Sequence, residues 1–216
     1  MKGKTGLLLL TCLLLNPAAK SQASDEKILS APARVVQQYY RINPFNKEFS
    51  NFLSRLMNDP TLTDTTLHRK TDSTLFFLEG NYTTHRPFFF RAGQVKVLLA
   101  ERELTIDSTE DFSTVFLYQL VGYAPGGKEG VQDVKTEFEK LSRQYKRVFE
   151  ISSSRELKSG QQVYGEVRDF YFTNVFFPIL TLAWSTREEK ENLVAITVRF
   201  MVYNNAAYLP ITANSP

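Results

Sequence analysis

Histidine, cysteine and closely spaced acidic residues are the side chains that most often carry chemistry, and this chain offers few of them. Its only histidines, His68 and His85, lie 17 positions apart, and neither belongs to a His-x-x-x-His pair or has a glutamate beside it. Metal sites in proteins need several such ligands that converge on one point. The sequence therefore predicts no metal site, and no motif in it predicts a cofactor.

Nucleophilic catalysis finds equally little support. The single cysteine, Cys12, lies inside an apolar N-terminal run, and the Gly-x-Ser-x-Gly motif of many hydrolases is absent. A Ser-His-Asp triad would have to use one of the two histidines. His85 is the better placed, because Thr84-His85-Arg86-Pro87 precedes an aromatic run where a pocket rim could form. A hydrolase with its site near His85 is thus the enzymatic alternative, although the sequence favours a non-enzymatic protein.

The acidic pairs and the glycine-rich segment have simpler explanations than catalysis or phosphate binding. Glu166 and Asp169 are three positions apart, so on a strand their side chains would point to opposite faces. Glu101 and Glu103 would share a face, where pairing with nearby arginines is expected. Residues 124–130 contain three glycines but lack the spacing of a phosphate-binding loop, so a turn that leads into a helix is expected there.

Aromatic residues are the most unusual feature, with 17 phenylalanines, 10 tyrosines and one tryptophan. Several stand in runs, such as Phe88-Phe89-Phe90 and Phe170-Tyr171-Phe172, whose neighbours would point to opposite faces of a sheet. If both faces are covered, these rings form the core. Otherwise some of them line a groove for a glycan, a lipid or a peptide. The candidate ligand-binding residues are Tyr118, Tyr171, Trp184 and His85.

The N-terminus has the pattern of an export signal. Lys2 and Lys4 precede an apolar run, Leu7–Leu15, and small residues follow up to Ala23. A permanent membrane span needs about 20 apolar residues, so this nine-residue run is too short. We expect residues 1–23 to be a signal peptide that is cleaved between Ala23 and Ser24, leaving no stable membrane span.

Cleavage would change the composition of the working protein. Residues 24–216 contain no cysteine, which excludes disulfides and thiolate ligands. Loss of the leader also removes Lys2, Lys4 and Lys20, so the 26 basic and 23 acidic residues of the whole chain become equal in number. A neutral chain lacks the basic surplus of nucleic-acid-binding proteins. We therefore expect a periplasmic or secreted protein with no nucleic-acid partner.

Hydrophobic periodicity predicts one α+β domain over residues 24–216. Helices over 31–42 and 46–57 would form an N-terminal hairpin, and a long helix would cover 131–148, where apolar residues recur at steps of three and four. Between and after them, about six to seven extended runs predict a mainly antiparallel sheet with the long helix on one face. The run over 112–123 is apolar on both faces, which is typical of a central strand.

This fold class is shared by proteins of unrelated function, so the functional prediction is broad. We expect an exported, non-enzymatic domain that binds an unidentified protein, glycan or lipid. One alternative is a carrier that holds a small apolar or glycan ligand in an aromatic-lined cavity. The other is the hydrolase with a site near His85.

Overall fold

The structure is a computed structural model, and it describes residues 34–40, 49–68, 78–84, 95–105, 112–172, 178–186 and 192–203. The predicted signal peptide and its cleavage position between Ala23 and Ser24 lie outside these residues. So do His85 and the run Phe88-Phe89-Phe90. Among the described helices, none combines the length and apolar character needed to cross a membrane.

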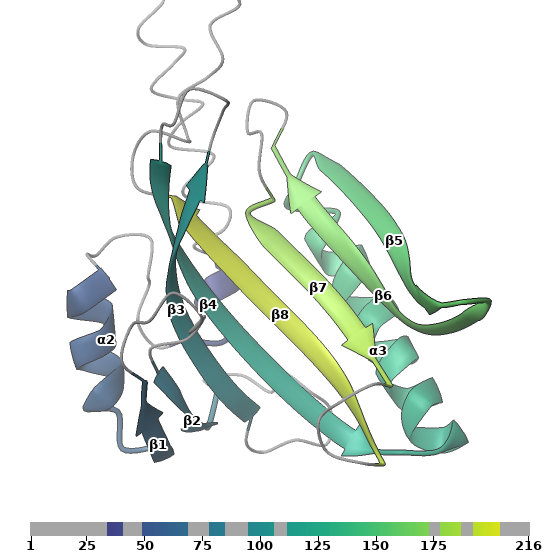
Figure 1. The fold of residues 1–216 in the computed structure, drawn as a ribbon, viewed down its shortest axis with the longest axis horizontal. Coiled ribbons are helices and arrows are strands. Elements are labelled where there is room, and N and C mark those ends of the chain that lie inside the picture. Colours follow the sequence, from purple (N-terminus) through teal and green to yellow (C-terminus); the bar gives the residue numbers. More distant parts are fainter. Residues whose placement is uncertain are drawn as a thin grey trace, which may run out of the picture.

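An eight-stranded sheet makes up most of the described chain (Figure 1). Every neighbouring pair of strands is antiparallel, and the order is β1-β2-β3-β4-β8-β7-β6-β5. The strands are β1 (Thr63–Leu67), β2 (Leu78–Tyr82), β3 (Val95–Thr105), β4 (Phe112–Pro125), β5 (Ile151–Ser159), β6 (Gln162–Tyr171), β7 (Leu180–Ser185) and β8 (Leu193–Tyr203).

The sheet is mainly antiparallel, as predicted, and β4 is one of its inner strands. β4 lies between β3 and β8 and pairs with both along most of its length. Its side chains are apolar on both faces: Tyr118 and Leu120 point to the same face as the helices, and Leu117 and Val121 point to the other. A strand buried on both faces gains from apolar residues at every position, which explains the pattern in the sequence.

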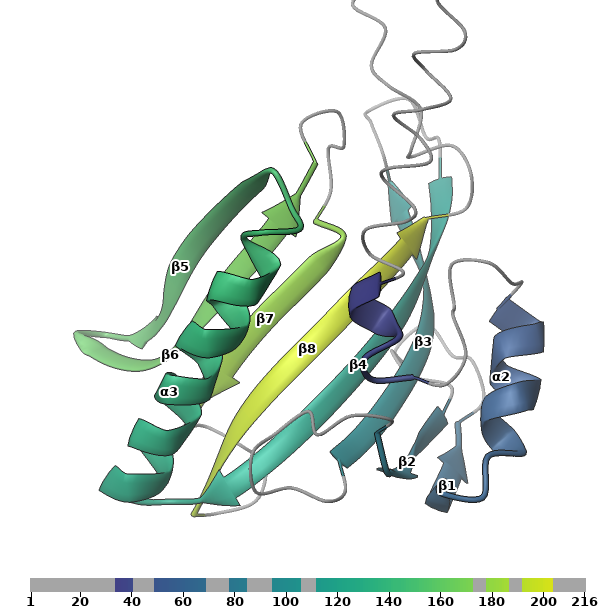
Figure 2. The ribbon, with the colours of Figure 1, turned by 180° about the vertical axis from the view of Figure 1, so that it is seen from behind.

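The long predicted helix is confirmed as α3 (Lys128–Tyr145), which packs over β4, β7 and β8 (Figure 2). Its buried side chains include Val134, Phe138, Leu141 and Tyr145, the stripe that the sequence pattern indicated. We call the side of the sheet that α3 covers the helix face, and the opposite side the far face. The main hydrophobic core lies on the helix face.

Two N-terminal segments complete the helix face. Residues 34–36 are helical, and α2 (Phe49–Met57) lies beside β1. Tyr40, just after the first segment, packs its ring on Phe52 of α2, and Phe52 meets Tyr118 of β4 edge-on at 4.8 Å. The predicted hairpin joins these segments through residues 41–48, which lie outside the described residues.

The predicted strand number of six to seven is too low, because the sequence hides two strands. β1 has the sequence TDTTL and β5 has ISSSRELKS. Both are edge strands, and almost all of their residues are exposed, so neither shows the alternation that identifies a half-buried strand. The polar residues over 61–74 predict a loop and Gly80-Asn81 predicts a turn, but the structure has β1 within the first range and β2 across the second.

The sequence places Pro178 within an extended run over 174–185, where its missing amide hydrogen predicts an edge position or a bulge. Pro178 immediately precedes β7, which is an inner strand between β6 and β8. Because the proline lies ahead of the strand, its missing amide hydrogen takes nothing from the ladder.

Candidate functional site

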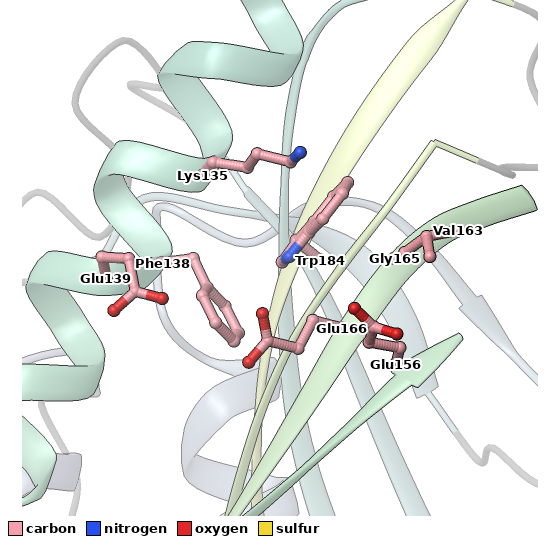
Figure 3. Close-up of a pocket in the computed structure, with 8 residues that line it drawn as sticks. All are labelled: Lys135, Phe138, Glu139, Glu156, Val163, Gly165, Glu166 and Trp184. Carbon is pink, nitrogen blue, oxygen red and sulfur yellow. The ribbon is translucent and has the colours of Figure 1, made fainter. Parts of the chain in front are cut away.

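A pocket of about 240 Å³ opens between α3 and the end of the sheet formed by β5, β6 and β7 (Figure 3). Eight residues line it: Lys135, Phe138, Glu139, Glu156, Val163, Gly165, Glu166 and Trp184.

Helix periodicity and strand register bring these residues together. Lys135, Phe138 and Glu139 are three and four positions apart on α3, so they share one side of the helix. In the sheet, Glu166 of β6 is the direct partner of Trp184 on β7 and of Glu156 on β5. Directly opposed residues project from the same face, so these three side chains point toward α3.

Cations lie against both aromatic rings of the pocket. The Lys135 ammonium is 4.7 Å from the centroid of the Trp184 ring, and the Arg168 guanidinium carbon is 4.8 Å from the centroid of the Phe138 ring. Such contacts use the negative potential above an aromatic face. Trp184 is only 5 % exposed, so the surrounding structure fixes its ring.

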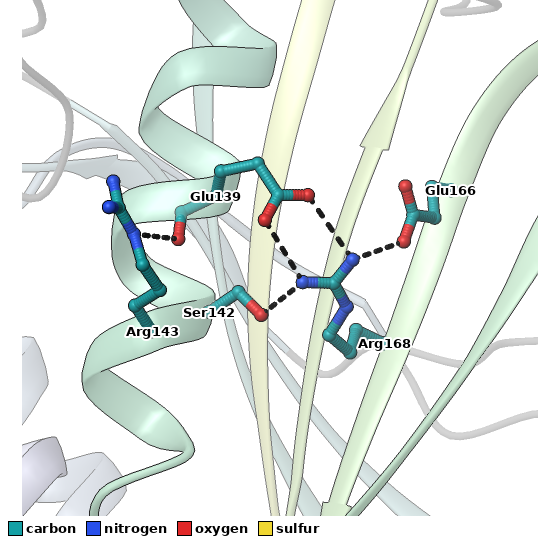
Figure 4. A network of polar contacts seen from close by, with 5 residues as sticks. All are labelled: Glu139, Ser142, Arg143, Glu166 and Arg168. Atoms are coloured by element: carbon teal, nitrogen blue, oxygen red, sulfur yellow. Dashed lines mark hydrogen bonds and ion pairs between the residues drawn. The ribbon is translucent and has the colours of Figure 1, made fainter.

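Arg168 of β6 lies beside the pocket and holds two of its lining carboxylates in a network of polar contacts (Figure 4). Its terminal nitrogens donate to both carboxylate oxygens of Glu139, at 3.3 and 3.2 Å, and to Glu166 Oε1 at 2.6 Å. It also donates to the Ser142 hydroxyl. Burial by itself lowers the pKa of Arg168, but the hydrogen bonds to Glu139 and Glu166 outweigh it and raise that pKa above its ordinary value.

Glu139 and Arg143 are four positions apart on α3, and this spacing predicts an ion pair between their side chains. This prediction is wrong. Arg143 Nε donates to the backbone oxygen of Glu139 at 3.3 Å, while the Glu139 carboxylate reaches across to the sheet (Figure 4). A partly buried guanidinium that presents two parallel donors forms stronger hydrogen bonds with a carboxylate than an exposed guanidinium does.

Charges in and around the pocket are balanced. The three lining carboxylates are Glu139, Glu156 and Glu166. Three cations face them: Lys135 at the Trp184 ring, Arg168 in the network, and Lys158, whose ammonium lies 2.7 Å from Glu156 Oε2. The pocket is therefore strongly polar without a net charge.

Three of the four predicted ligand-binding residues are described by the structure, and it does not bring these three together. Trp184 lines the pocket. Tyr118 is fully buried in the core of β4, and Tyr171 lies half-buried near the end of β6. Tyr171 also projects from the far face, because its neighbour Phe170 packs on Tyr145 of α3. His85 lies outside the described residues.

Most pocket residues were missed by sequence reasoning. Lys135 and Glu139 flank the buried stripe of α3, so the helical pattern could have indicated that they border the sheet. Glu156 gave no signal, because the strand that carries it was not predicted. The sequence suggests Asp169 as the neighbour of Glu166, whereas in the structure Glu166 lies beside its cross-strand partners Glu156 and Trp184.

His68 is the one histidine of the two that the structure describes, and its buried Nε2 has no hydrogen-bond partner among the described residues. It follows β1, at the opposite edge of the sheet from the pocket. Within the described ranges, no three histidine, cysteine, aspartate or glutamate residues are grouped so that they could hold a metal ion.

No family model, no curated protein and no solved structure matches the chain.

Proposed function

We propose that this chain is an exported, non-enzymatic binding domain whose pocket takes one sugar unit of a glycan. The observation that carries the proposal is the pocket itself, in which the indole of Trp184 lies among hydrogen-bonding groups whose charges balance. Each property of the pocket restricts the ligand in a different way.

Size restricts the ligand to a small unit. Sites for drug-sized ligands usually enclose about 300–1,000 Å³. The present pocket, at about 240 Å³, is smaller and open on one side. A single ring with its substituents suits this space, and the opening lets the rest of a longer chain extend into solvent.

The lining favours a ligand that is apolar on one face and polar at its rim. Trp184 and Phe138 are buried at the base of the pocket, and the exposed Val163 adds apolar surface to the lining, so the C–H face of a sugar ring would meet a small apolar area there. Glu156 and Glu166 supply oxygens that accept hydrogen bonds, and Lys135 supplies an ammonium group with three donors. Sugar hydroxyls both donate and accept, so they can use all of these groups.

Charge balance disfavours strongly charged ligands. An anion would meet three lining carboxylates, and a cation would have to compete with Lys135, Lys158 and Arg168, which already accompany the acidic groups. A purely apolar ligand would leave these polar groups without water, which is unfavourable. The core offers it no better place, since Tyr118, Phe170 and Phe200 fill the interior with fully buried rings.

Trp184 provides a direct test, because it is the only tryptophan in the chain. Its fluorescence should change saturably when neutral mono- and oligosaccharides are added to the whole protein. Uronic acids, alkyl amines and fatty acids serve as comparison ligands, and they should bind at least about tenfold more weakly, a difference of about 1.4 kcal/mol. Recovery of unchanged sugar by chromatography would agree with a binding role.

Matched variants connect the signal to the pocket. Lys135→Ala should weaken sugar binding, and Glu156→Gln should do the same. Lys140→Ala is the control, because Lys140 lies on the same helix but pairs with Glu137, away from the pocket. The proposal fails if no sugar changes the fluorescence, if Lys140→Ala weakens binding as much as Lys135→Ala, or if the sugar is cleaved.

A further inference from the structure

β5 forms one outer edge of the sheet, and no other described strand pairs with its outer side (Figure 1). Eight of its nine residues are exposed. On its inner side, β5 pairs with β6 without interruption from Ile151 to Leu157, and the register shifts only after Leu157. A regular strand with one row of free N–H and C=O groups can accept a further strand.

The opposite edge of the sheet is less suited to this role. β1 has only five residues, its register with β2 shifts between Thr63 and Thr66, and Asp64 has a positive φ of 51°. Such irregularities disturb the spacing of backbone groups that a partner strand would need. The two edges of the sheet therefore differ in their capacity to pair.

We propose that β5 pairs with β5 of a second copy of this chain, antiparallel and about a twofold axis through Ser154. The axis would be perpendicular to the sheet and would join two eight-stranded sheets into one. This axis keeps the helix faces of both copies on the same side of the joined sheet. Residues that oppose each other then project from the same face, so their residue numbers differ by an even number. Ser154 is the centre of the regular stretch Ile151–Leu157, so this register uses all of it.

Side-chain pairing also favours this register. Ile151 of each copy would oppose Leu157 of the other, which makes two apolar pairs. Ile151 is 47 % exposed in the single chain, so it has apolar surface to bury. Arg155 would oppose Ser153, and Glu156 would oppose Ser152, so no charge would face a like charge directly.

Neighbouring registers lack these properties. A twofold axis through Arg155 would oppose two arginines, and one through Glu156 would oppose two glutamates. An axis through Ser153 would place Glu150 opposite Glu156. Like charges directly opposite each other destabilise an antiparallel pair. An axis through Leu157 would leave most of the regular stretch unpaired.

The helix layer leaves room for the second copy. α3 makes its main contacts with β4, β7 and β8 and reaches β6 through Arg168, and no described helix or strand lies beyond the outer side of β5 (Figure 2). The interface would also border the pocket, because Glu156 of β5 belongs to the lining and would lie opposite Ser152 of the second copy.

Introduced thiols test the register. In the whole chain with Cys12→Ser, which removes the only native thiol, Ser154→Cys places two thiols beside the twofold axis. They should form an intermolecular disulfide under mild oxidation at least about tenfold faster than Ser159→Cys, because a disulfide needs Cβ atoms about 4 Å apart. Ser159 lies on the same strand and is also exposed, but in this register its two copies would be about 34 Å apart.

A second measurement tests whether the dimer forms through the β5 edge of the sheet. Sedimentation at protein concentrations on the order of 10–100 µM should show a dimer that depends on concentration. Ile151→Lys should shift it to monomer, while Leu67→Lys, at an exposed apolar residue of β1, should leave the dimer intact. A monomeric chain, a dimer lost with Leu67→Lys but not with Ile151→Lys, or equal cross-linking of both cysteine variants would overturn the proposal.

Discussion

Arg168 on β6 and Glu139 on α3 are joined by two parallel hydrogen bonds, although 29 positions separate them in the sequence. Arg168 is held further by Glu166 on its own strand and by the Ser142 hydroxyl on the helix. The Arg168 side chain is only 12 % exposed, whereas that of Glu139 is 54 % exposed, so the contact is shielded from water on the sheet side and open to it on the helix side. It connects the two sides of the pocket.

Replacing Arg168 with alanine should destabilise the protein by about 1–3 kcal/mol, because a charge-assisted network is lost and Glu139 and Glu166 are left side by side. Thermal or urea unfolding measures this difference. Arg143→Ala is the matched control: it donates only to a backbone oxygen from an exposed position, so it should cost less than about 0.5 kcal/mol. Equal losses in the two variants would contradict the role given to Arg168.

The same pair shows why the site could not be predicted fully. Spacing along one helix is visible in the sequence, so Arg143 was expected to be the partner of Glu139. The actual partner depends on how α3 is placed over β6, which is a property of the tertiary fold. Trp184 was predicted as one of the aromatic residues that could line a groove, and Lys135 was missed because it is an ordinary exposed helix residue.

The strands also differ in how well the sequence predicts them. The sequence predicts extended runs over 94–106, 112–123 and 192–203, close to the bounds of β3, β4 and β8, because long apolar patterns mark these strands. β5 buries almost nothing, so hydrogen bonding to β6 alone determines that it is a strand. Tyr118 was predicted as one of the aromatic residues that could line a groove, but β4 is an inner strand and the Tyr118 ring is fully buried in the core.

Tyr39 and Tyr145 share a buried hydrogen bond between their hydroxyl groups, which connects the N-terminal segment to α3. Tyr39→Phe would leave the fully buried Tyr145 hydroxyl without this partner, at a cost of about 1–3 kcal/mol. The double variant Tyr39→Phe with Tyr145→Phe removes both polar groups and should be closer to the wild type than the sum of the single changes. Chemical unfolding of all four proteins gives the coupling energy. Additive losses would show that the hydroxyls do not interact.

Alkaline pH should unfold the protein cooperatively. Burial is the main cause that raises the pKa of Tyr39, Tyr40 and Tyr145 above the ordinary value of 10.0. All three hold their protons more tightly in the folded state, so the stability that they contribute is complete below pH 10 and is lost as the pH rises above it. Each should lower the free energy of unfolding by about 1.4 kcal/mol per pH unit in that range.

Circular dichroism and tyrosinate absorbance, recorded together between pH 8 and 12, test this expectation. The absorbance of the buried tyrosines should rise only as the secondary structure is lost. Tyr40→Phe should make the decline less steep by about one third, because one of three titrating groups is removed. Its hydroxyl has no hydrogen-bond partner among the described residues, so the variant should fold normally at neutral pH. Full ionisation of the tyrosines in a protein that stays folded would be inconsistent with this account.

Gly130, in the first turn of α3, lies directly against the end of β4. A Cβ atom at this position would fall well inside the contact distance of the Pro125 carbonyl oxygen, and that oxygen belongs to the backbone, which cannot turn aside as a side chain can. Gly130→Ala should therefore destabilise the protein by about 1–3 kcal/mol or more, although alanine is the better helix former. Gln132→Ala, at an exposed position of the same helix, should be neutral or slightly stabilising. Thermal unfolding of the two variants separates the explanations: a Gly130→Ala protein as stable as Gln132→Ala would show that α3 does not begin against Pro125.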